Sequence, residues 1–186
     1  EKIGKYFQDI LQTLGLDLSD SSLKNTPKRL AKMYVTEIFK WLNKKNEPSL
    51  SMFDNNMQYS EMVLVKNIKV MSVCEHHFLP FIWEAFIAYF PWKKIIGLSK
   101  ISRVVNYFAK KPQVQERLTE EVYNFLKEKL GTESIAVIIK AKHYCVIMRW
   151  AEDTNADTVT SKLWWVFLKD QNTRNEFLQL VNFNGL

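Results

Sequence analysis

All three histidines and both cysteines of this 186-residue chain lie in two short stretches. The first, SVCEHHFLPF, contains Cys74, His76 and His77, and the second, AKHYCVIMR, contains His143 and Cys145. Cysteine and histidine are the side chains that bind zinc and related soft metals. One metal centre can form only in a fold that brings the two stretches together, and this requirement restricts the possible folds.

Two spacings indicate how these side chains could share an ion. The C-x2-H spacing of Cys74 and His77 lets one turn present a thiolate and an imidazole together. His143 and Cys145 are two residues apart, so in a strand both point to one face. A catalytic zinc needs three protein ligands, an open position and a neighbouring group that transfers protons. We therefore predict that Cys74, His77 and Cys145 bind zinc, with His76 and His143 beside it.

Three other interpretations of the same residues remain open. Single histidines and cysteines are usually ordinary core or surface residues, so the five could be unrelated. Two cysteines and two histidines could also form a closed structural zinc site with four protein ligands. The last is a disulfide, but a histidine close to each cysteine favours reduced thiols that bind metal.

The charge balance is basic, with 26 Lys and Arg against 20 Asp and Glu, a net charge of +6. The basic residues stand singly or in short pairs without a dense block, so we expect no nucleic-acid partner. No run approaches the ~20 apolar residues that cross a bilayer, and the first residues do not resemble a secretory signal. We expect a cytoplasmic protein without a membrane partner.

Three basic residues are candidates for binding an anionic substrate. Lys100 and Arg103 fall near the start of a helix that we expect to begin at Ser99, where the helix dipole favours an anion. Arg149 lies four residues after Cys145. We expect the three cations to form a wall near the metal that suits phosphate groups, the alternative being ordinary surface charge.

The periodicity of apolar residues predicts an α+β fold of one domain. Helices are expected in the first 45 residues, from residue 99 to a break at 112, from after this break to Gly131, and over 172–181. Strands are expected over 62–70, 81–90, 134–142 and 159–168. The polar segment 43–60 is expected to be a connecting loop. We divide the chain into an N-terminal helical arm, residues 1–50, and a catalytic body, residues 51–186.

Several strings of the sequence resemble the GTP cyclohydrolase I family. They are TPKRLAKMYVTEIF, VCEHHFLPF, IIGLSK, KPQVQERLTEEV, HYCVIMR, TVTS and NTRNEFL, in the family's order over residues 26–183. The resemblance implies a tunnelling fold, an antiparallel sheet with helices on one face, whose subunits pair into a barrel and stack as a homodecamer. It also implies zinc-dependent hydrolysis of GTP at C8 to formate and 7,8-dihydroneopterin triphosphate, the first step of pterin and folate synthesis.

The resemblance assigns roles at the reaction centre. Cys74, His77 and Cys145 are the zinc ligands, and water on zinc attacks C8. His76 and His143 work beside the metal, and His143 is the group that protonates the imidazole ring of the substrate.

The resemblance also assigns the residues that hold the substrate. Ser99 lies near the ribose ring oxygen, and Glu116 accepts hydrogen bonds from the guanine edge with Gln115 beside it. The triphosphate meets Lys100, Arg103 and Arg149, together with Arg29 from a neighbouring subunit. Active sites shared between chains make oligomerisation a condition of activity.

All six tryptophans depart from the family pattern. Trp41, Trp83, Trp150 and Trp165 stand at glycine positions, and Trp92 and Trp164 where glycine is frequent. The chain has 5 glycines, against roughly 13 expected from average usage. We hypothesise that these are UGA codons that the source organism reads as glycine, which UGG codons would contradict; the alternative is ordinary core or interface aromatics.

Two other functions compete with the cyclohydrolase. A non-catalytic, zinc-stabilised assembly or binding protein could keep the same fold. The nitrile reductase of queuosine synthesis also shares it, but uses a cysteine thioimide and NADPH without catalytic zinc, so the CEHH and H-x-C strings argue against that activity.

Overall fold

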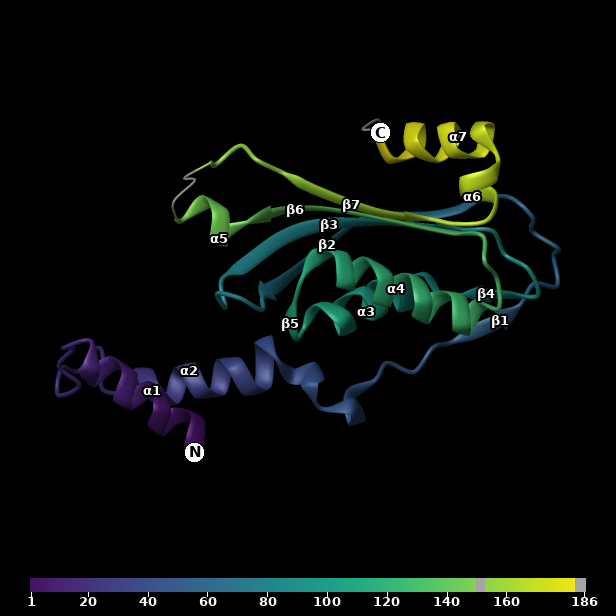
Figure 1. Ribbon diagram of the computed structural model, residues 1–186. Helices are drawn as coiled ribbons and strands as arrows, with labels where there is room; N and C mark the ends of the chain where they lie inside the picture. The colour runs from purple at the N-terminus through teal and green to yellow at the C-terminus, as the bar shows by residue number, and fades with distance from the viewer. Residues whose placement is uncertain (150–152, 183–186) are drawn as a thin grey trace. The chain divides into compact units, whose positions relative to one another are not determined.

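The computed structural model describes residues 1–149 and 153–182, which form two compact units, Glu1–Asn46 and Glu47–Leu186 (Figure 1). Each unit is described separately. No helix within the described ranges combines the length and the apolar character that crossing a membrane requires.

The first unit is helical. Helix α1 (Lys2–Thr13) packs on α2 (Thr26–Met33), and the chain continues through a π-helical turn, η1 (Tyr34–Ile38), and two 3-10 turns, η2 (Lys40–Leu42) and η3 (Lys44–Asn46). Gly15, with φ +79°, follows shortly after the end of α1. Every residue of α1 and α2 is at least partly exposed. The unit therefore presents apolar side chains to its surroundings, among them Ile3, Tyr6, Ile10, Leu14 and Val35.

The second unit is built on a five-stranded sheet with the strand order β5-β2-β3-β6-β7. The strands are β2 (Val63–Cys74), β3 (Pro80–Tyr89), β5 (Pro112–Gln113), β6 (Ile135–His143) and β7 (Thr158–Leu163). All neighbours are antiparallel except β5, which runs parallel to β2. A separate pair, β1 (Met52–Asp54) and β4 (Lys94–Ile96), lies partly within the segment predicted to be a loop.

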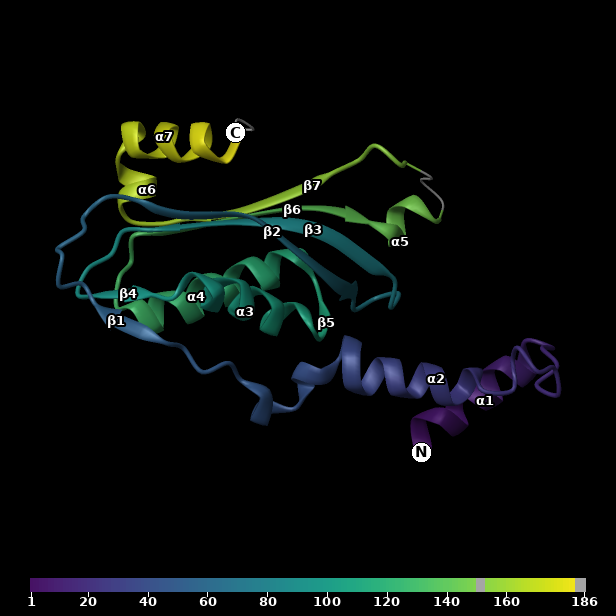
Figure 2. The same cartoon turned by 180° about the vertical axis from the view of Figure 1, so that it is seen from behind.

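Helices cover both faces of this sheet (Figures 1 and 2). Helices α3 (Leu98–Ala109) and α4 (Gln115–Leu130) bury the larger core, which alternate residues of β3 such as Ala85 and Ile87 join. The intervening Phe86 points to the other face, where it packs with Phe167 and Phe177 of α6 (Val166–Lys169) and α7 (Gln171–Asn182). The α+β class is confirmed, and the C-terminal helices add a layer beyond the single helical face that we expected.

Several boundaries differ from the sequence-based prediction, and the strand expected over 62–70 runs on to Cys74. The expected strand over 159–168 ends at Leu163, and α6 follows after a turn at Trp164 and Trp165. Helix α3 begins at Leu98 with Gly97 as its N-cap, so Ser99 lies inside its first turn. Gly131 ends α4 in the left-handed conformation with φ +64°, as predicted.

Trp165 has a backbone conformation that favours glycine. Its φ is +51° and its ψ is −116°, a combination that side chains with a Cβ rarely adopt. Trp83 is buried, and its indole N–H finds no hydrogen-bond partner among the described residues. Trp150 lies outside the described residues. These observations support the glycine hypothesis at position 165 most directly.

We expect Trp165→Gly to raise the free energy of unfolding. The change relieves about 1–3 kcal/mol of backbone strain. Two smaller effects oppose it: the loss of a cation–π contact with Lys169, about 0.5–1 kcal/mol, and a destabilisation of similar size because glycine increases the conformational entropy of the unfolded chain. The net effect is on the order of 1 kcal/mol, measured by urea unfolding. Trp92→Gly is the control, because Trp92 is also exposed but has no positive φ. Equal effects of both changes contradict the strain argument.

Candidate metal centre

The register of three strands brings the two histidine and cysteine stretches together. Ser72 of β2 pairs with Phe81 of β3, which in turn pairs with His143 of β6. Strands β2 and β6 run in the same direction on either side of β3, so their C-terminal ends lie at the same end of the sheet. Cys74 ends β2 and Cys145 follows the end of β6 by two residues. Cys74 and Cys145, 71 positions apart in sequence, therefore lie on strands separated only by β3.

A tight turn between β2 and β3 presents the first pair of ligands. The Phe78 N–H donates to the Cys74 carbonyl at 2.9 Å, and the Cys74 N–H donates to the Leu79 carbonyl at 2.9 Å. Phe78 has φ +53°, which closes the turn. Cys74 and His77, three residues apart on one helical turn, consequently face the same side. The prediction from the C-x2-H spacing agrees with this geometry.

The second pair is arranged differently from our expectation. His143 is the last residue of β6, but Tyr144–Ile147 forms a helical turn, α5, so the two-residue alternation of a strand does not apply. The argument that His143 and Cys145 share a strand face is wrong. Pairing of β6 with β7 reaches only Ala141, opposite Thr158, and pairing with β3 ends at His143. Cys145 is directed to the metal ligands by the helical turn.

Cys74, His77 and Cys145 place their ligand atoms within 4.8 Å of one another. The Cys74 Sγ lies 3.8 Å from His77 Nδ1, close to the ~3.6 Å that tetrahedral zinc with ordinary bond lengths imposes. Burial raises the pKa of the Cys145 thiol, and the neighbouring Cys74 raises it further. Both cysteines are free thiols. Two sulfurs and one imidazole are a donor set suited to zinc, and His77 is exposed, which leaves access for a further ligand.

His143 is held by contacts that define its proton-bearing nitrogen. The Gln115 side-chain N–H₂ donates to the carbonyls of Ile139 and Thr158, both at 3.0 Å. The Gln115 Oε1 is therefore the acceptor that faces His143 Nε2 at 2.7 Å. Nε2 carries the proton, and Nδ1 of the neutral ring is free to accept one.

The surroundings of the His143 ring favour its neutral form. The ring stacks on the buried Phe81 with centroids 4.8 Å apart. Burial lowers the pKa of His143, and the Glu116 carboxylate opposes this shift in part. His76 is exposed, and its Nδ1 lies 3.7 Å from the Cys74 sulfur. Both histidines predicted to work beside the metal thus adjoin the ligand cluster.

Residues at the start of α3 lie at the other end of the sheet. The Ile96 N–H donates to the Tyr89 hydroxyl at 3.4 Å, whereas the Ala109 carbonyl accepts from Ser72 at 2.7 Å, close to Cys74. Ten helical residues separate Ser99 from Ala109, a distance of about 15 Å. By the same rise, Lys100 lies about 13 Å and Arg103 about 9 Å before Ala109 along α3, so Ser99 and Lys100 are at the helix end away from the metal-binding turn and Arg103 is near its middle.

The other predicted substrate residues are distributed as follows. Glu116 is exposed in the first turn of α4, directly after Gln115. Arg149 is exposed after α5, and its charge acts on Cys145. Arg29 belongs to α2 of the other unit.

The sequence prediction missed one ion pair at the metal-binding turn. The Arg117 guanidinium donates two hydrogen bonds to the Glu75 carboxylate, at 2.7 and 2.8 Å. These bonds hold the pKa of Glu75 below its ordinary value. Glu75 lies within the CEHH string and Arg117 directly follows Gln115 and Glu116, but 42 positions separate the partners, and only the fold joins them.

The fold and the site together define an α+β protein with an accessible cluster of two cysteines and one histidine that could hold a metal ion. Residues 3–182 match the family model described as GTP cyclohydrolase I. The GTP cyclohydrolase 1 of Flavobacterium johnsoniae is 51% identical over 99% of this chain and 82% of its own, and that of Yersinia enterocolitica is 47% identical over 99% and 84%. The chain belongs to the GTP cyclohydrolase I family.

The chain is also similar to solved structures. The archaeosine synthase QueF-Like, in its apo form, aligns with 54% of this chain and 90% of its own, with 15% identity and a TM-score of 0.43.

We expect Gln115→Met to lower the free energy of unfolding by about 1–3 kcal/mol, because the carbonyls of the buried Ile139 and of Thr158 lose their donor. Methionine keeps a similar volume, so loss of hydrogen bonding is the main change. Glu116→Gln, an exposed change at the next position, is the control and should leave stability within about 0.5 kcal/mol. Urea unfolding measures both, and equal stability of the two variants contradicts the proposed hydrogen bonds.

Proposed function

We propose that this protein binds one zinc ion through Cys74, His77 and Cys145 and hydrolyses GTP at C8 of the purine. The products are formate and 7,8-dihydroneopterin triphosphate, at the entry to pterin and folate synthesis. The observation that carries the proposal is the cluster of three ligand atoms within 4.8 Å beside a histidine of fixed tautomer. Membership of a family whose curated members are named as this enzyme favours catalysis, and the non-catalytic alternative has no comparable support.

Zinc, when bound, supplies an activated water nucleophile at neutral pH. Proton transfer then falls to the chain's own groups. His143 accepts a proton at Nδ1, because Nε2 is committed to Gln115, and delivers it to the imidazole ring of the substrate. His76, exposed and close to the Cys74 sulfur, is the second proton carrier. The Gln115 contact thus determines which atom of His143 faces the reaction.

The substrate is held by groups that match its chemistry. The Glu116 carboxylate, exposed beside His143, accepts N–H groups from the guanine edge. Arg149 of the same chain meets the triphosphate, whereas Lys100 and Arg103 lie about 13 and 9 Å along α3 from Ala109, the residue that contacts Ser72 near Cys74. We therefore assign Ser99, Lys100 and Arg103 at this site to a neighbouring subunit, and Arg29 to a neighbour as well.

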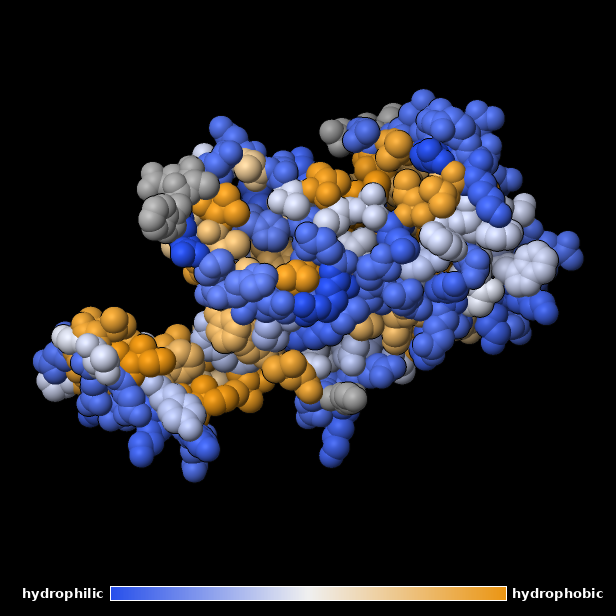
Figure 3. Space-filling view, viewed as in Figure 1, coloured by the Kyte–Doolittle hydropathy of each residue, from blue (hydrophilic) through white to orange (hydrophobic). Residues whose placement is uncertain are grey.

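Exposed apolar surface supports an assembly of several chains. Apolar side chains are visible on the helical arm and on the second unit (Figure 3). Strand β7 forms one edge of the sheet, and its Val159 is exposed, so the edge is free to pair with another sheet. We propose a homodecamer with shared active sites. Free thiols at the metal centre suit the reducing cytoplasm, where we place the protein.

The central test is formate release from GTP. We expect the zinc-loaded protein to release one formate per GTP, and removal of the metal by a chelator to abolish the reaction. Added zinc should restore activity, and magnesium should not, because thiolate ligands prefer softer ions. Cys145→Ser should lose activity together with bound zinc. A chelated, metal-free protein with full activity contradicts the proposal.

Mixing two inactive variants tests the shared site. Cys74→Ser removes a metal ligand and Lys100→Ala removes a phosphate contact, so each variant alone should be nearly inactive. In co-assembled oligomers, sites that take the metal from one chain and Lys100 from the next are intact. An equal mixture should regain about a quarter of the wild-type specific activity, half multiplied by half, if assembly is random. No recovery in mixed oligomers, verified by differently tagged chains, places Lys100 and Cys74 in the same chain's site.

A further inference from the structure

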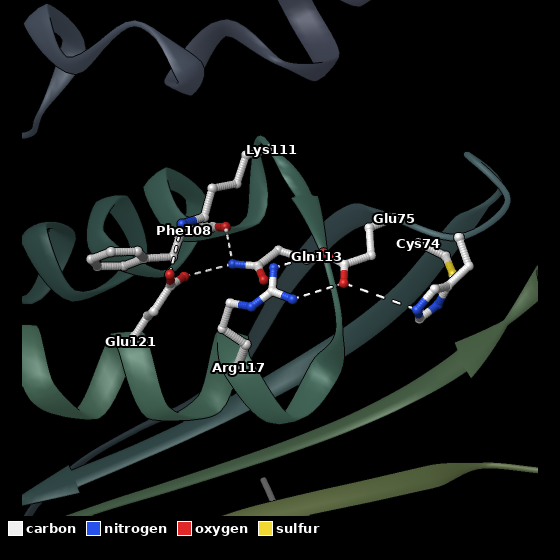
Figure 4. A network of polar contacts seen from close by, with 8 residues as sticks. Cys74, Glu75, Phe108, Lys111, Gln113, Arg117 and Glu121 are labelled. Carbon is white, nitrogen blue, oxygen red and sulfur yellow. Dashed lines mark hydrogen bonds and ion pairs between the residues drawn. The ribbon is translucent and has the colours of Figure 1, made fainter.

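Glu75 connects the metal-binding turn, residues 74–78, to helix α4. Its carboxylate receives two hydrogen bonds from Arg117, at 2.7 and 2.8 Å, and lies 4.0 Å from His76 Nε2 (Figure 4). A two-bonded pair of this kind fixes the direction of the carboxylate as well as its distance. Glu75 adjoins the ligand Cys74 and is two residues before the ligand His77. The position of Glu75 therefore affects both ligands.

A second contact holds the backbone of the same turn. The Glu75 N–H donates to the Gln113 carbonyl of β5 at 3.0 Å. The buried Gln113 side chain donates to the Phe108 carbonyl at 3.0 Å and to Glu121 at 2.6 Å, and Glu121 also accepts from Lys111 at 2.7 Å. Gln113, whose carbonyl accepts the Glu75 N–H, is thus bonded through its side chain to α3 and α4 (Figure 4).

We propose that Arg117 is a positioning residue for the metal centre, acting through Glu75 to hold the turn in its ligand-presenting conformation. The inference rests on the proposed function only in taking Cys74, His77 and Cys145 as the metal ligands. Arg117 is not a catalytic residue, because its contacts are with Glu75 and not with the ligand atoms.

The exposure of this pair indicates whether it affects global stability or the geometry of the metal ligands. The side chains of Arg117 and Glu75 are 43% and 31% exposed, and ion pairs at such positions contribute little to global stability. The turn itself contains a strained residue, Phe78 with φ +53°. Contacts from outside the turn are needed to keep such a conformation, so loss of the pair acts on ligand geometry more than on folding.

The test compares zinc affinity among matched variants, by competition with a chromogenic chelator. Arg117→Met and Glu75→Gln should each bind zinc about tenfold more weakly. The double variant should lose no more than either single change, because both remove one interaction. Arg117→Lys keeps the charge but loses the paired geometry and should fall between wild type and Arg117→Met. Glu120→Gln, which breaks the 2.7 Å pair of α4 with Lys162, is the control and should bind zinc normally.

Two further readouts separate positioning from general destabilisation. The absorption spectrum of the cobalt-substituted protein should change in Arg117→Met and stay unchanged in Glu120→Gln, because it reports ligand geometry. The melting temperatures of Arg117→Met and Glu120→Gln, both metal-free, should agree. Zinc affinity within twofold of wild type in Arg117→Met, or an equal loss in Glu120→Gln, overturns the proposal, and Arg117→Lys provides the same comparison if Arg117→Met does not fold.

Failure of this inference is distinguishable from failure of the proposed function. If the variants lose zinc affinity but wild type releases no formate from GTP, the positioning role stands and the cyclohydrolase assignment fails. If wild type releases formate and the variants bind zinc as tightly as wild type, the assignment stands and the positioning role fails.

Discussion

The antiparallel pairing of β3 with both β2 and β6 is the constraint on which the site depends. It aligns Ser72, Phe81 and His143 across three strands and brings the two metal-binding segments to one edge of the sheet. Because side chains alternate between faces, a shift of one residue in the pairing of β3 with β6 would turn His143 away from Phe81. The buried residues of β3 on both faces, packed against α3 and α4 on one side and α7 on the other, oppose such a shift.

The first turns of α4 serve several parts of the site at once. Gln115 binds His143 and two strand carbonyls, Glu116 influences the His143 charge, and Arg117 holds Glu75. Three consecutive residues of a helix point in different directions, about 100° apart. The start of α4 can therefore contact the sheet and the metal-binding turn together, and displacement of this helix would disturb the proton-transfer group and the metal ligands at the same time.

Residue type and short spacing predicted the clustered cysteines and histidine better than the residues that hold them in place. The clustering of Cys74, His77 and Cys145 could be predicted because cysteine and histidine are scarce in this chain and suited to metals. The pair of Glu75 and Arg117 depends on contacts 42 positions apart, for which local patterns carry no signal. Strands rich in β-branched residues were predicted well, but β5 is only two residues long, and α5 begins where strand pairing is lost. Tertiary pairing sets those boundaries.

The separation of the cations from the metal has a consequence for how activity depends on assembly. Lys100 and Arg103 lie near the start of α3 and Cys74 near its end, and a rigid helix cannot shorten that distance. In the assembly that we propose, a triphosphate that contacts all of them binds between two chains. In the proposed assembly, any change that weakens association, including one on the helical arm, reduces activity by removing phosphate contacts, although Cys74, His77 and Cys145 of each chain remain in place.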